Sequence, residues 1–403
     1  MTQAIKLRID ELPPYPLGRI AEEVQALRLR GVDVLDLSQV NIDLAPPQRA
    51  LDKLVQASLR PQNHRYSSSQ GIQKLREAVA EWYQAKFDVA ISAAHEVVVT
   101  FGIKEGISHL LMTTLQTGDN VIVPTPAYPV HRAGVFLAGG NFIGLDLPIA
   151  ASGILAGKSA EGDQFFAALE HSILQTWPRP RAMILSFPHN PTTTVVDHEF
   201  FERLVDFAVH NNLILIHDFA YAGLGLNYQL PSLLSVPRAK ECAIEFCSLS
   251  KSYSSPGWRV GFGVGNAQLV SALKRMKSYV DFGIFQPLQI AAIETLADRD
   301  QYAKEIQNVY QSRRDLLVSG LSELGFEVTP AHAGLLVWAK IPQKFREQGS
   351  AEFARMLLES NAVAICPGLG FDPAARDYAR FALVENESRL TRALELIRNF
   401  IEK

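Results

Sequence analysis

The sequence predicts an α/β fold with two domains, and two observations lead to this prediction. From about residue 70 to about residue 295, short apolar runs alternate with helical segments, which is typical of a sheet flanked by helices. After that point a long charged helix leads into short strands and helices, which is typical of an α+β unit. The expected division is a large ligand-binding domain over 45–295, and a smaller domain made of 1–44 and 296–403.

Seven apolar runs are the expected strands of a mostly parallel sheet in the large domain. Most are nearly continuous apolar stretches, as expected of strands that helices cover on both faces. They occupy residues 96–102, 120–126, 141–147, 182–188, 213–219, 243–250 and 258–265. The connection between the last two is too short for a parallel crossover, so one of this pair should be antiparallel.

Segments of helical character separate many of these runs. Helices are expected over 104–117, 163–175, 197–211, 267–280 and 299–323. Near the N-terminus, Ile20, Val24 and Leu27 recur at helical spacing before Gly31, which indicates one more helix. Residues 148–164 are expected to form a surface loop.

Composition and charge argue against several classes of protein. The net charge of −3 lacks the basic excess of a nucleic-acid-binding surface. No apolar run reaches the length that spans a bilayer, and the N-terminus lacks the apolar core of a signal peptide. The three cysteines Cys242, Cys247 and Cys366 form neither a disulfide framework nor a metal-ligand spacing. We therefore expect a cytoplasmic protein without nucleic-acid or membrane partners.

The residues that follow the expected strands form the candidate site, because sheets of this kind bind ligands at the carboxyl ends of their strands. A glycine turn that opens a helix, an amide, a carboxylate, two phenols, a lysine and an arginine all fall there. These residues are Gly102, Ile103, Lys104, Tyr128, Asn190, Asp218, Tyr221, Ser248, Lys251 and Arg259. The set lacks the His, Cys and carboxylate spacing of a zinc site, so no metal is expected.

This inventory is that of a pyridoxal 5'-phosphate site. The helix after Gly102 offers free backbone N–H groups to a phosphate, and Ser248 and Arg259 would complete the phosphate site. A lysine beside a bound phosphate and among apolar strands would have a lowered pKa, so the neutral amine of Lys251 would form a Schiff base with a carbonyl. Asp218 would hold the positive charge of the ring nitrogen.

Seven stretches, in order along the chain, resemble the fold-type I, class I/II aminotransferases. Among these the chain looks most like the bacterial alanine (glutamate–pyruvate) aminotransferases and the LL-diaminopimelate aminotransferases. The stretches are "HRYSSSQGIQKLREAVAEWY", "VTFGIKEG", "PTPAYPVH", "FPHNPTTTVV", "HDFAYAGL", "SLSKSYSSPGWRVGF" and "YARFALVEN". The resemblance covers essentially the whole chain. It implies a homodimer that moves an amino group between a small L-amino acid, alanine first, and a 2-oxo acid such as 2-oxoglutarate.

The resemblance also implies roles for the cofactor-binding residues. Lys251 would bind the cofactor as an imine and later shuttle a proton between the substrate Cα and the cofactor, while Asp218 would pair with the ring nitrogen. The remaining roles are ring stacking by Tyr128, hydrogen bonds to the 3'-oxygen from Tyr221 and Asn190, and phosphate binding by the backbone of Ile103 and Lys104 with Ser248 and Arg259. Tyr66 would reach the phosphate of the neighbouring subunit.

The substrate side of the resemblance is less complete. Arg380, helped by Asn190, would bind the substrate carboxylate, and Tyr15, Val40 and Gln286 are the other expected substrate-side residues. Relatives have glycine where this chain has Val40, often serine or glycine where it has Ile103, and asparagine or threonine where it has Gln286. Valine would narrow the pocket or move its loop. These departures leave two alternatives open: another pyridoxal-phosphate reaction, such as elimination, cyclisation or oxidation of a specialised amino acid, or a regulatory module without activity.

Three histidines lie near these residues in the sequence. His189 and His217 flank expected site residues, and for both a structural role with satisfied hydrogen bonds is favoured over a catalytic one. His131 is expected on a helix surface.

Overall fold

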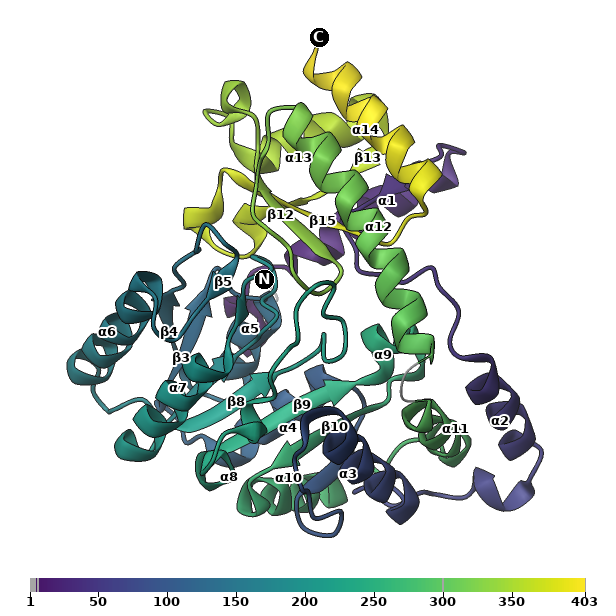
Figure 1. The fold of residues 1–403 in the computed structure, drawn as a ribbon, viewed down its shortest axis with the longest axis vertical. Coiled ribbons are helices and arrows are strands. Elements are labelled where there is room, and N and C mark those ends of the chain that lie inside the picture. The colour runs from purple at the N-terminus through teal and green to yellow at the C-terminus, as the bar shows by residue number, and fades with distance from the viewer. Residues whose placement is uncertain (1–4, 6, 299–300, 403) are drawn as a thin grey trace.

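A seven-stranded sheet forms the centre of the larger part of the molecule in the computed structural model, which describes residues 5, 7–298 and 301–402 (Figure 1). Its strand order is β2-β10-β9-β8-β6-β3-β4. The strands are β2 (Val97–Thr100), β3 (Asn120–Thr125), β4 (Asn141–Asp146), β6 (Ala182–Leu185), β8 (Ile214–Asp218), β9 (Ala243–Ser248) and β10 (Gly261–Gly265). β10 is antiparallel to both of its neighbours, and the other pairs are parallel. The predicted mostly parallel sheet, with one of its last two strands antiparallel, is confirmed.

Helices cover both faces of this sheet. Successive apolar side chains along a buried strand point to opposite faces, so both faces need apolar cover. Val97 and Val99 join one core cluster with helices α3, α6 and α7, whereas Val98 joins another with α4, α5 and α10. The helices of this part are α2 (Gln48–Ser58), α3 (Gln73–Phe87), α4 (Ile103–Thr114), α5 (Pro129–Leu137), α6 (Ala160–Gln175), α7 (His198–Asn211), α8 (Ala239–Cys242), α9 (Leu249–Ser252), α10 (Ala267–Val280) and α11 (Gln286–Ala297). The predicted helices are present, with their ends shifted by a few residues.

A second, antiparallel sheet belongs to the smaller part of the molecule, at the top of Figure 1. Its order is β11-β12-β15-β14. The elements here are α12 (Gln301–Glu323), β11 (Glu327–Val328), β12 (Leu336–Lys340), α13 (Gly349–Asn361), β14 (Cys366–Pro367), β15 (Tyr378–Ala382) and α14 (Glu387–Ile401). Of the helix expected over 299–323, residues 299 and 300 lie outside the described residues.

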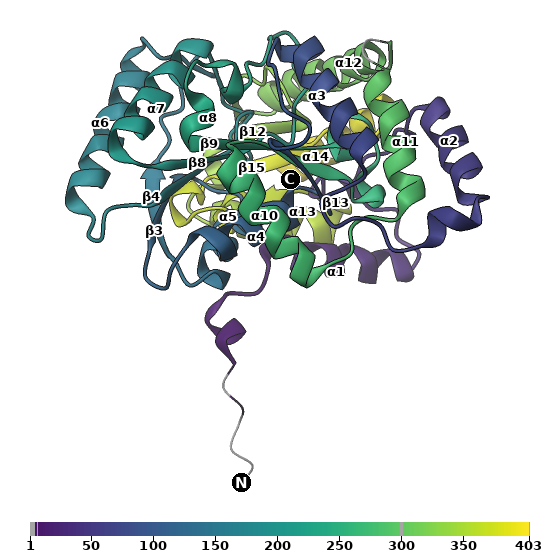
Figure 2. The same ribbon diagram turned by 90° about the horizontal axis from the view of Figure 1, so that it is seen from below.

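The N-terminal segment joins this smaller part. After α1 (Pro16–Leu29), strand β1 (Leu35–Asp36) pairs in parallel with β13 (Val363–Ala364). Before α1, the short helical turn Arg8–Glu11 lies at the edge of the molecule (Figure 2), where Arg8 donates to the Phe136 carbonyl oxygen. The domain boundaries at residues 45 and 295 stay a prediction, and residues 1–4, 6, 299, 300 and 403 of the predicted small domain lie outside the described part of the chain.

The expectation of a surface loop over 148–164 holds only for residues 148–153 and 156–159. This stretch contains β5 (Ile154–Leu155), which pairs in parallel with β7 (Val195–Val196), and α6 begins within it. Leu155 is fully buried. A two-residue strand is too short to show a periodic pattern in sequence, so the stretch resembles a loop.

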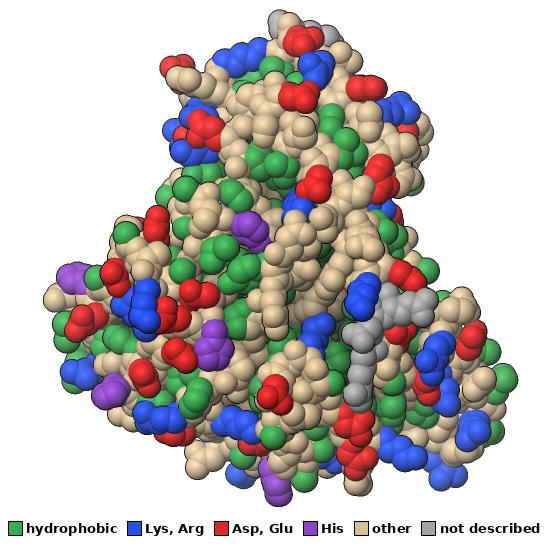
Figure 3. Space-filling view, in the orientation of Figure 1, with side chains coloured by type: hydrophobic (Ala, Val, Ile, Leu, Met, Phe, Trp, Pro, Cys, Tyr) green, Lys and Arg blue, Asp and Glu red, His purple; other side chains and the backbone are tan. Residues whose placement is uncertain are grey.

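The surface carries both signs of charge in mixture. Acidic and basic side chains are interspersed over the face shown in Figure 3, in keeping with the small net charge. Among the helices of the described residues, none combines the length and the apolar character that crossing a membrane requires.

Candidate active site

A cavity of about 460 Å³ lies between the large sheet and the smaller part of the molecule. It brings together most of the residues that the sequence predicts for the site. Its lining includes Tyr15, Val40, Ile103, Lys104, Tyr128, Asn190, Asp218, Tyr221, Ser248, Lys251, Arg259 and Arg380. The volume is in the usual range for a small-molecule site. We call it the cleft.

Lys251 enters the cleft from the short helix α9, directly after the buried strand β9. Ser248 ends this strand and caps the helix, its side chain accepting a hydrogen bond from the backbone N–H of Ser250. The Lys251 Nζ donates to the carbonyl oxygen of Val40 at 2.8 Å. Burial, followed by the positive charges of Arg380 and Arg259, lowers the pKa of the Lys251 amine to about 8. The amine is therefore closer to its neutral, nucleophilic form than an ordinary lysine is.

Asp218 presents an unpartnered carboxylate oxygen at the end of β8. Its side chain is buried, and Oδ2 lies 2.9 Å from His131 Nε2. Oδ1 is buried and has no hydrogen-bond partner among the described residues. A buried carboxylate oxygen without a donor is unfavourable, so this atom is suited to a donor that a bound molecule supplies.

His131 is a site residue that sequence reasoning missed, because the expected place on a helix surface is wrong. The side chain is 2% exposed and lies between Asp218 and the ring of Tyr128, which packs edge-on at 5.6 Å. His131 and Val135 are four residues apart on α5, and both are buried. That spacing, together with the position of His131 just after an expected site tyrosine, is the signal that could have identified it.

The other two histidines have structural contacts. His189 Nδ1 lies 2.8 Å from Thr192 Oγ1, and burial followed by the charge of His131 lowers the pKa of His189 to about 3. His217 is fully buried, with Nδ1 2.8 Å from Glu245 Oε2.

The turn before α4 is shaped for an anion. Gly102 caps this helix with φ of 81°, and a Cβ added there would meet the Arg259 guanidinium. Arg259 donates to the carbonyl oxygens of Pro256 at 3.0 Å and Phe101 at 3.3 Å, which holds it beside the turn. The free N–H groups at the start of α4 and this guanidinium therefore face one end of the cleft. Gly102 itself is buried and is absent from the cleft lining.

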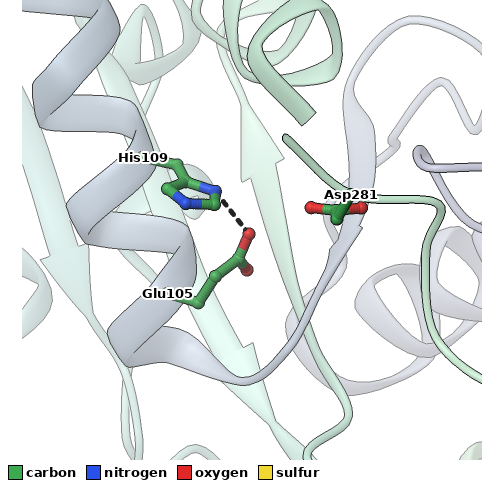
Figure 4. A group of neighbouring side chains, drawn as sticks. All are labelled: Glu105, His109 and Asp281. Atoms are coloured by element: carbon green, nitrogen blue, oxygen red, sulfur yellow. Dashed lines mark ion pairs between the residues drawn. The ribbon is translucent and has the colours of Figure 1, made fainter. Parts of the chain in front are cut away.

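A partly buried cluster of ion pairs lies beside this turn, and Figure 4 shows the pair between Glu105 and His109. Within the described residues, Glu105, His109 and Asp281 form one group that could hold a metal ion. However, the fully buried Lys277 Nζ already donates to Glu105 at 3.0 Å and to Asp281 at 2.7 Å. Glu105 in turn accepts from the backbone N–H of Phe101 at 2.9 Å. The ammonium supplies the positive charge that these carboxylates need, and the cluster anchors the segment beside Gly102.

Arg380 lies on the opposite wall of the cleft, on β15. It is 1% exposed. One guanidinium nitrogen donates to Asn190 Oδ1 at 3.0 Å and the other to the Ser38 carbonyl oxygen at 2.7 Å. The buried Nε has no partner among the described residues. A guanidinium with five N–H donors keeps capacity for a carboxylate in this position.

Three tyrosines line the cleft together with Arg380 and Lys251. Tyr15 donates a hydrogen bond to Tyr128 at 3.3 Å, from the N-terminal segment to the large part. Burial raises the pKa of Tyr15, Tyr128 and Tyr221 above the usual value for a phenol. The three hydroxyls are therefore neutral and able to donate at physiological pH.

Two predicted residues do not reach the cleft within this chain. Tyr66 is 84% exposed and its ring lies 4.5 Å from that of Phe282. Gln286 Nε2 donates to Asn63 Oδ1 at 3.2 Å. Their expected roles across a subunit interface stay predictions.

The family follows from a comparison with known proteins. Residues 32–397 match the family model described as "aminotransferase class I and II". The chain belongs to the class I and II aminotransferases. It is a pyridoxal-phosphate-dependent enzyme that transfers an amino group between an amino acid and a 2-oxo acid, as the resemblance of the sequence implied.

The chain aligns over nearly its whole length with proteins named as aminotransferases. It is 44% identical to the glutamate-pyruvate aminotransferase AlaC of Escherichia coli, over 97% of this chain and 92% of that protein. It is 39% identical to the LL-diaminopimelate aminotransferase of Moorella thermoacetica, over 98% of each. Among solved structures, substrate-bound BacF from Bacillus subtilis is 28% identical with a TM-score of 0.88, covering 99% of this chain and 98% of that one.

The cleft of this aminotransferase fits pyridoxal phosphate on observations of its own. The unpartnered Oδ1 of Asp218 suits a ring N–H, and the Lys251 amine suits the cofactor aldehyde. The start of α4, with Arg259 beside it, suits the phosphate. All these groups line one cleft or border it, so the donor set matches the cofactor of the family.

The lowered pKa of Lys251 leads to a pH prediction. Only the neutral amine reacts with an aldehyde, so the cofactor-free aminotransferase should capture pyridoxal phosphate at a rate that rises with pH through a midpoint near 8. An ordinary lysine would have its midpoint at about 10.4. Because Arg380 contributes to the lowering, Arg380→Met should move the midpoint to higher pH. Absorbance of the bound cofactor measures the rate, and a wild-type midpoint at the value of an ordinary lysine would contradict the prediction.

Proposed function

We propose that this aminotransferase uses a small L-amino acid, alanine first, as amino donor and 2-oxoglutarate as acceptor. The observation that carries the chemistry is the convergence of the Lys251 amine, the free Asp218 oxygen and the Arg380 guanidinium on one cleft. The choice of substrates rests on the 44% identity to a protein named glutamate-pyruvate aminotransferase. A second candidate donor is LL-diaminopimelate, which the name of the Moorella thermoacetica relative favours.

The proposed roles of the residues follow from their positions. When bound, pyridoxal phosphate supplies an electron sink for the negative charge left at the substrate Cα. Lys251 takes the proton from that carbon and later gives it to C4' of the cofactor. Asp218 holds the positive charge on the ring nitrogen, and His131 keeps Asp218 in place through its 2.9 Å contact. The two residues lie at the ends of adjacent parallel strands, because Asp218 ends β8 and Lys251 follows β9 on α9.

The remaining residues bind and orient. Arg380 and Asn190 hold the substrate carboxylate, since the two side chains already bond to each other at 3.0 Å. The proposed phosphate ligands are the N-terminus of α4 at Ile103 and Lys104, with Ser248 and Arg259. Tyr128 covers the ring, and Tyr221, with Asn190, donates to the 3'-oxygen.

Half-reactions with single amino acids test this function. Protein with bound pyridoxal phosphate is mixed with alanine, glutamate or LL-diaminopimelate in the absence of a 2-oxo acid acceptor. The absorbance of the cofactor and the amount of 2-oxo acid formed are then measured. A transaminase should stop after one equivalent of 2-oxo acid per site, and alanine and glutamate should react fastest. Continued turnover without an acceptor would indicate elimination or another reaction type instead. If LL-diaminopimelate reacted faster than alanine, LL-diaminopimelate would be the preferred amino donor.

We also propose that the enzyme is a homodimer with shared sites. Tyr66, Tyr279 and Phe282 are large aromatic side chains exposed to solvent in the single chain, and Tyr66 packs against Phe282. Exposed aromatic groups of this kind are typical of interaction surfaces. A partner that covers them would bring Tyr66 to the phosphate of the neighbouring site and Gln286 toward its substrate.

Hybrid dimers test the shared site. Tyr66→Phe lacks the hydroxyl, Lys251→Ala lacks the amine, and homodimers of each should be weak or inactive. After subunit exchange, the mixture should regain activity, up to about one quarter of the wild-type level per total site, because one site of each hybrid holds both native residues. Absence of recovery after exchange has been verified by labelled subunits would show that one chain builds each site.

A further inference from the structure

The carbonyl oxygen that faces Lys251 belongs to a short connecting segment, Ser38 to Ala45, which we call the Val40 loop. Val40 accepts from Lys251 Nζ at 2.8 Å. Its side chain packs against the core cluster of the smaller part, which also includes Tyr221 and Leu224. Val40 therefore meets the reacting lysine through its backbone, and the placement of the loop decides where that carbonyl lies.

Two arginines hold the Val40 loop near its ends. At its start, Arg380 donates to the Ser38 carbonyl at 2.7 Å. Further on, Arg313 of α12 binds Asp43 with two parallel hydrogen bonds, Nη1 to Oδ1 at 2.8 Å and Nη2 to Oδ2 at 2.7 Å. Such a bidentate pair fixes direction as well as distance. Val40 lies between the two anchors.

Arg313 also links the loop to the strand that carries Arg380. The same Nη1 donates to the Leu383 carbonyl at 3.1 Å, one residue after β15 ends. The Leu37 carbonyl, just before the loop, accepts from the backbone N–H of Ala382 at 2.8 Å. Arg313 is 3% exposed, so water competes weakly for its hydrogen bonds. These contacts fix the positions of the Val40 loop, Arg380 and Lys251 relative to one another.

We propose that Asp43 and Arg313 are a positioning pair for the reaction: they hold the Val40 carbonyl where it orients the free amine of Lys251. The inference rests on the proposed role of Lys251 as the base. The amine is free of cofactor both before the cofactor binds and while it carries the substrate proton. In both states the Val40 carbonyl accepts one N–H of the Lys251 nitrogen and so fixes its direction. In the neutral amine this also sets the direction of the lone pair that takes up the substrate proton.

Three variants test the pair. Arg313→Gln removes the bidentate contact, Arg313→Lys keeps the charge with a single donor group, and Asp43→Asn removes the charge of the partner, whose side chain is one third exposed. The matched control is Arg314→Gln on the same helix, since Arg314 is also buried but bonds to the Ala331 carbonyl and to Asp315. All four proteins are normalised to the amount of cofactor that borohydride fixes.

The main measurement is the rate of the half-reaction at saturating amino donor, with hydrogen or deuterium at Cα. Arg313→Gln and Asp43→Asn should each slow it about tenfold while keeping a deuterium effect, because a misplaced base slows the proton step. Arg313→Lys should fall between them and the wild type, since lysine does not replace a bidentate arginine. The Arg314→Gln control should match the wild type within about twofold, the ordinary scatter of such rates.

A second measurement does not depend on turnover. The rate at which cofactor-free protein captures pyridoxal phosphate should also fall about tenfold in Arg313→Gln, because the same amine is then less well oriented. If Arg313→Gln and Asp43→Asn equal the Arg314→Gln control in both rates, the positioning role is excluded. If instead the wild type gives no half-reaction, the proposed function fails, and the capture rate alone still decides the role of the pair.

Discussion

Replacing Lys251 with alanine should lower the rate of the half-reaction by about 10⁴-fold or more. The amine is both the covalent attachment point and the proposed proton carrier, and loss of a general base alone typically costs about 10²–10⁴-fold. The variant should still bind pyridoxal phosphate without a covalent bond, because Arg259, Asp218 and the N-terminus of α4 remain. Stopped-flow absorbance after mixing with amino donor measures the rate, and borohydride treatment followed by peptide mapping shows whether any lysine is labelled.

Lys104→Ala is the matched control for this variant. Lys104 also lines the cleft, and burial followed by the charge of Arg259 lowers the pKa of its amine. The residue contributes its backbone to the proposed phosphate site, and its side chain should therefore be replaceable with a small loss. If Lys251→Ala kept turnover close to that of Lys104→Ala, or if the label mapped to Lys104, Lys251 would not be the reacting lysine.

Replacing Asp218 with asparagine should lower the half-reaction rate by about 10²–10³-fold, the usual loss when one preorganised group that stabilises developing charge is removed. Asparagine has the shape of aspartate but no negative charge, so a positive ring nitrogen loses its partner. Cofactor binding should weaken less than the rate falls, because the phosphate and lysine contacts remain. Absorbance titration measures binding, and the half-reaction measures the rate.

Asp146→Asn is the control for the loss of a carboxylate at the same edge of the sheet. Asp146 ends β4 as Asp218 ends β8, but it is exposed and lies outside the cleft lining. Its replacement should leave the rate near the wild-type value. A rate in Asp218→Asn close to that of Asp146→Asn would show that Asp218 is not the charge partner of the ring.

The large sheet could be predicted from sequence because its strands are buried on both faces and are therefore continuous apolar runs. Strands of this kind are typical of parallel sheets, in which the residues after the strands lie at one edge. Asp218 and Lys251 follow two such runs and could therefore be assigned to one site, whereas β10 is antiparallel. β5 could not be found this way, because its two residues carry no periodic signal.

Contacts between distant segments were beyond the sequence. The spacing of His131 and Val135 can indicate that His131 is buried, but it does not show which residue His131 meets, and its contact with Asp218 joins two distant segments. Likewise, the sequence indicated that Val40 departs from the glycine of relatives, and it suggested a steric effect of the side chain. The structure adds a contact that sequence patterns do not report: the backbone carbonyl of Val40 bonds to Lys251.

The pairing of β1 with β13 has a consequence for how the protein is made. Leu35 and Val363 are partners in this small sheet, although most of the chain separates them. During synthesis, the segment that carries Tyr15 and Val40 leaves the ribosome long before its partner strand and Arg380 do. Large chains tend to fold domain by domain as they emerge. The large sheet can therefore form first, while the N-terminal segment still lacks its partner strand β13. The enzyme therefore acquires its complete cleft only near the end of translation, and a nascent chain arrested before β13 should lack the wall that Arg380 and the Val40 loop provide.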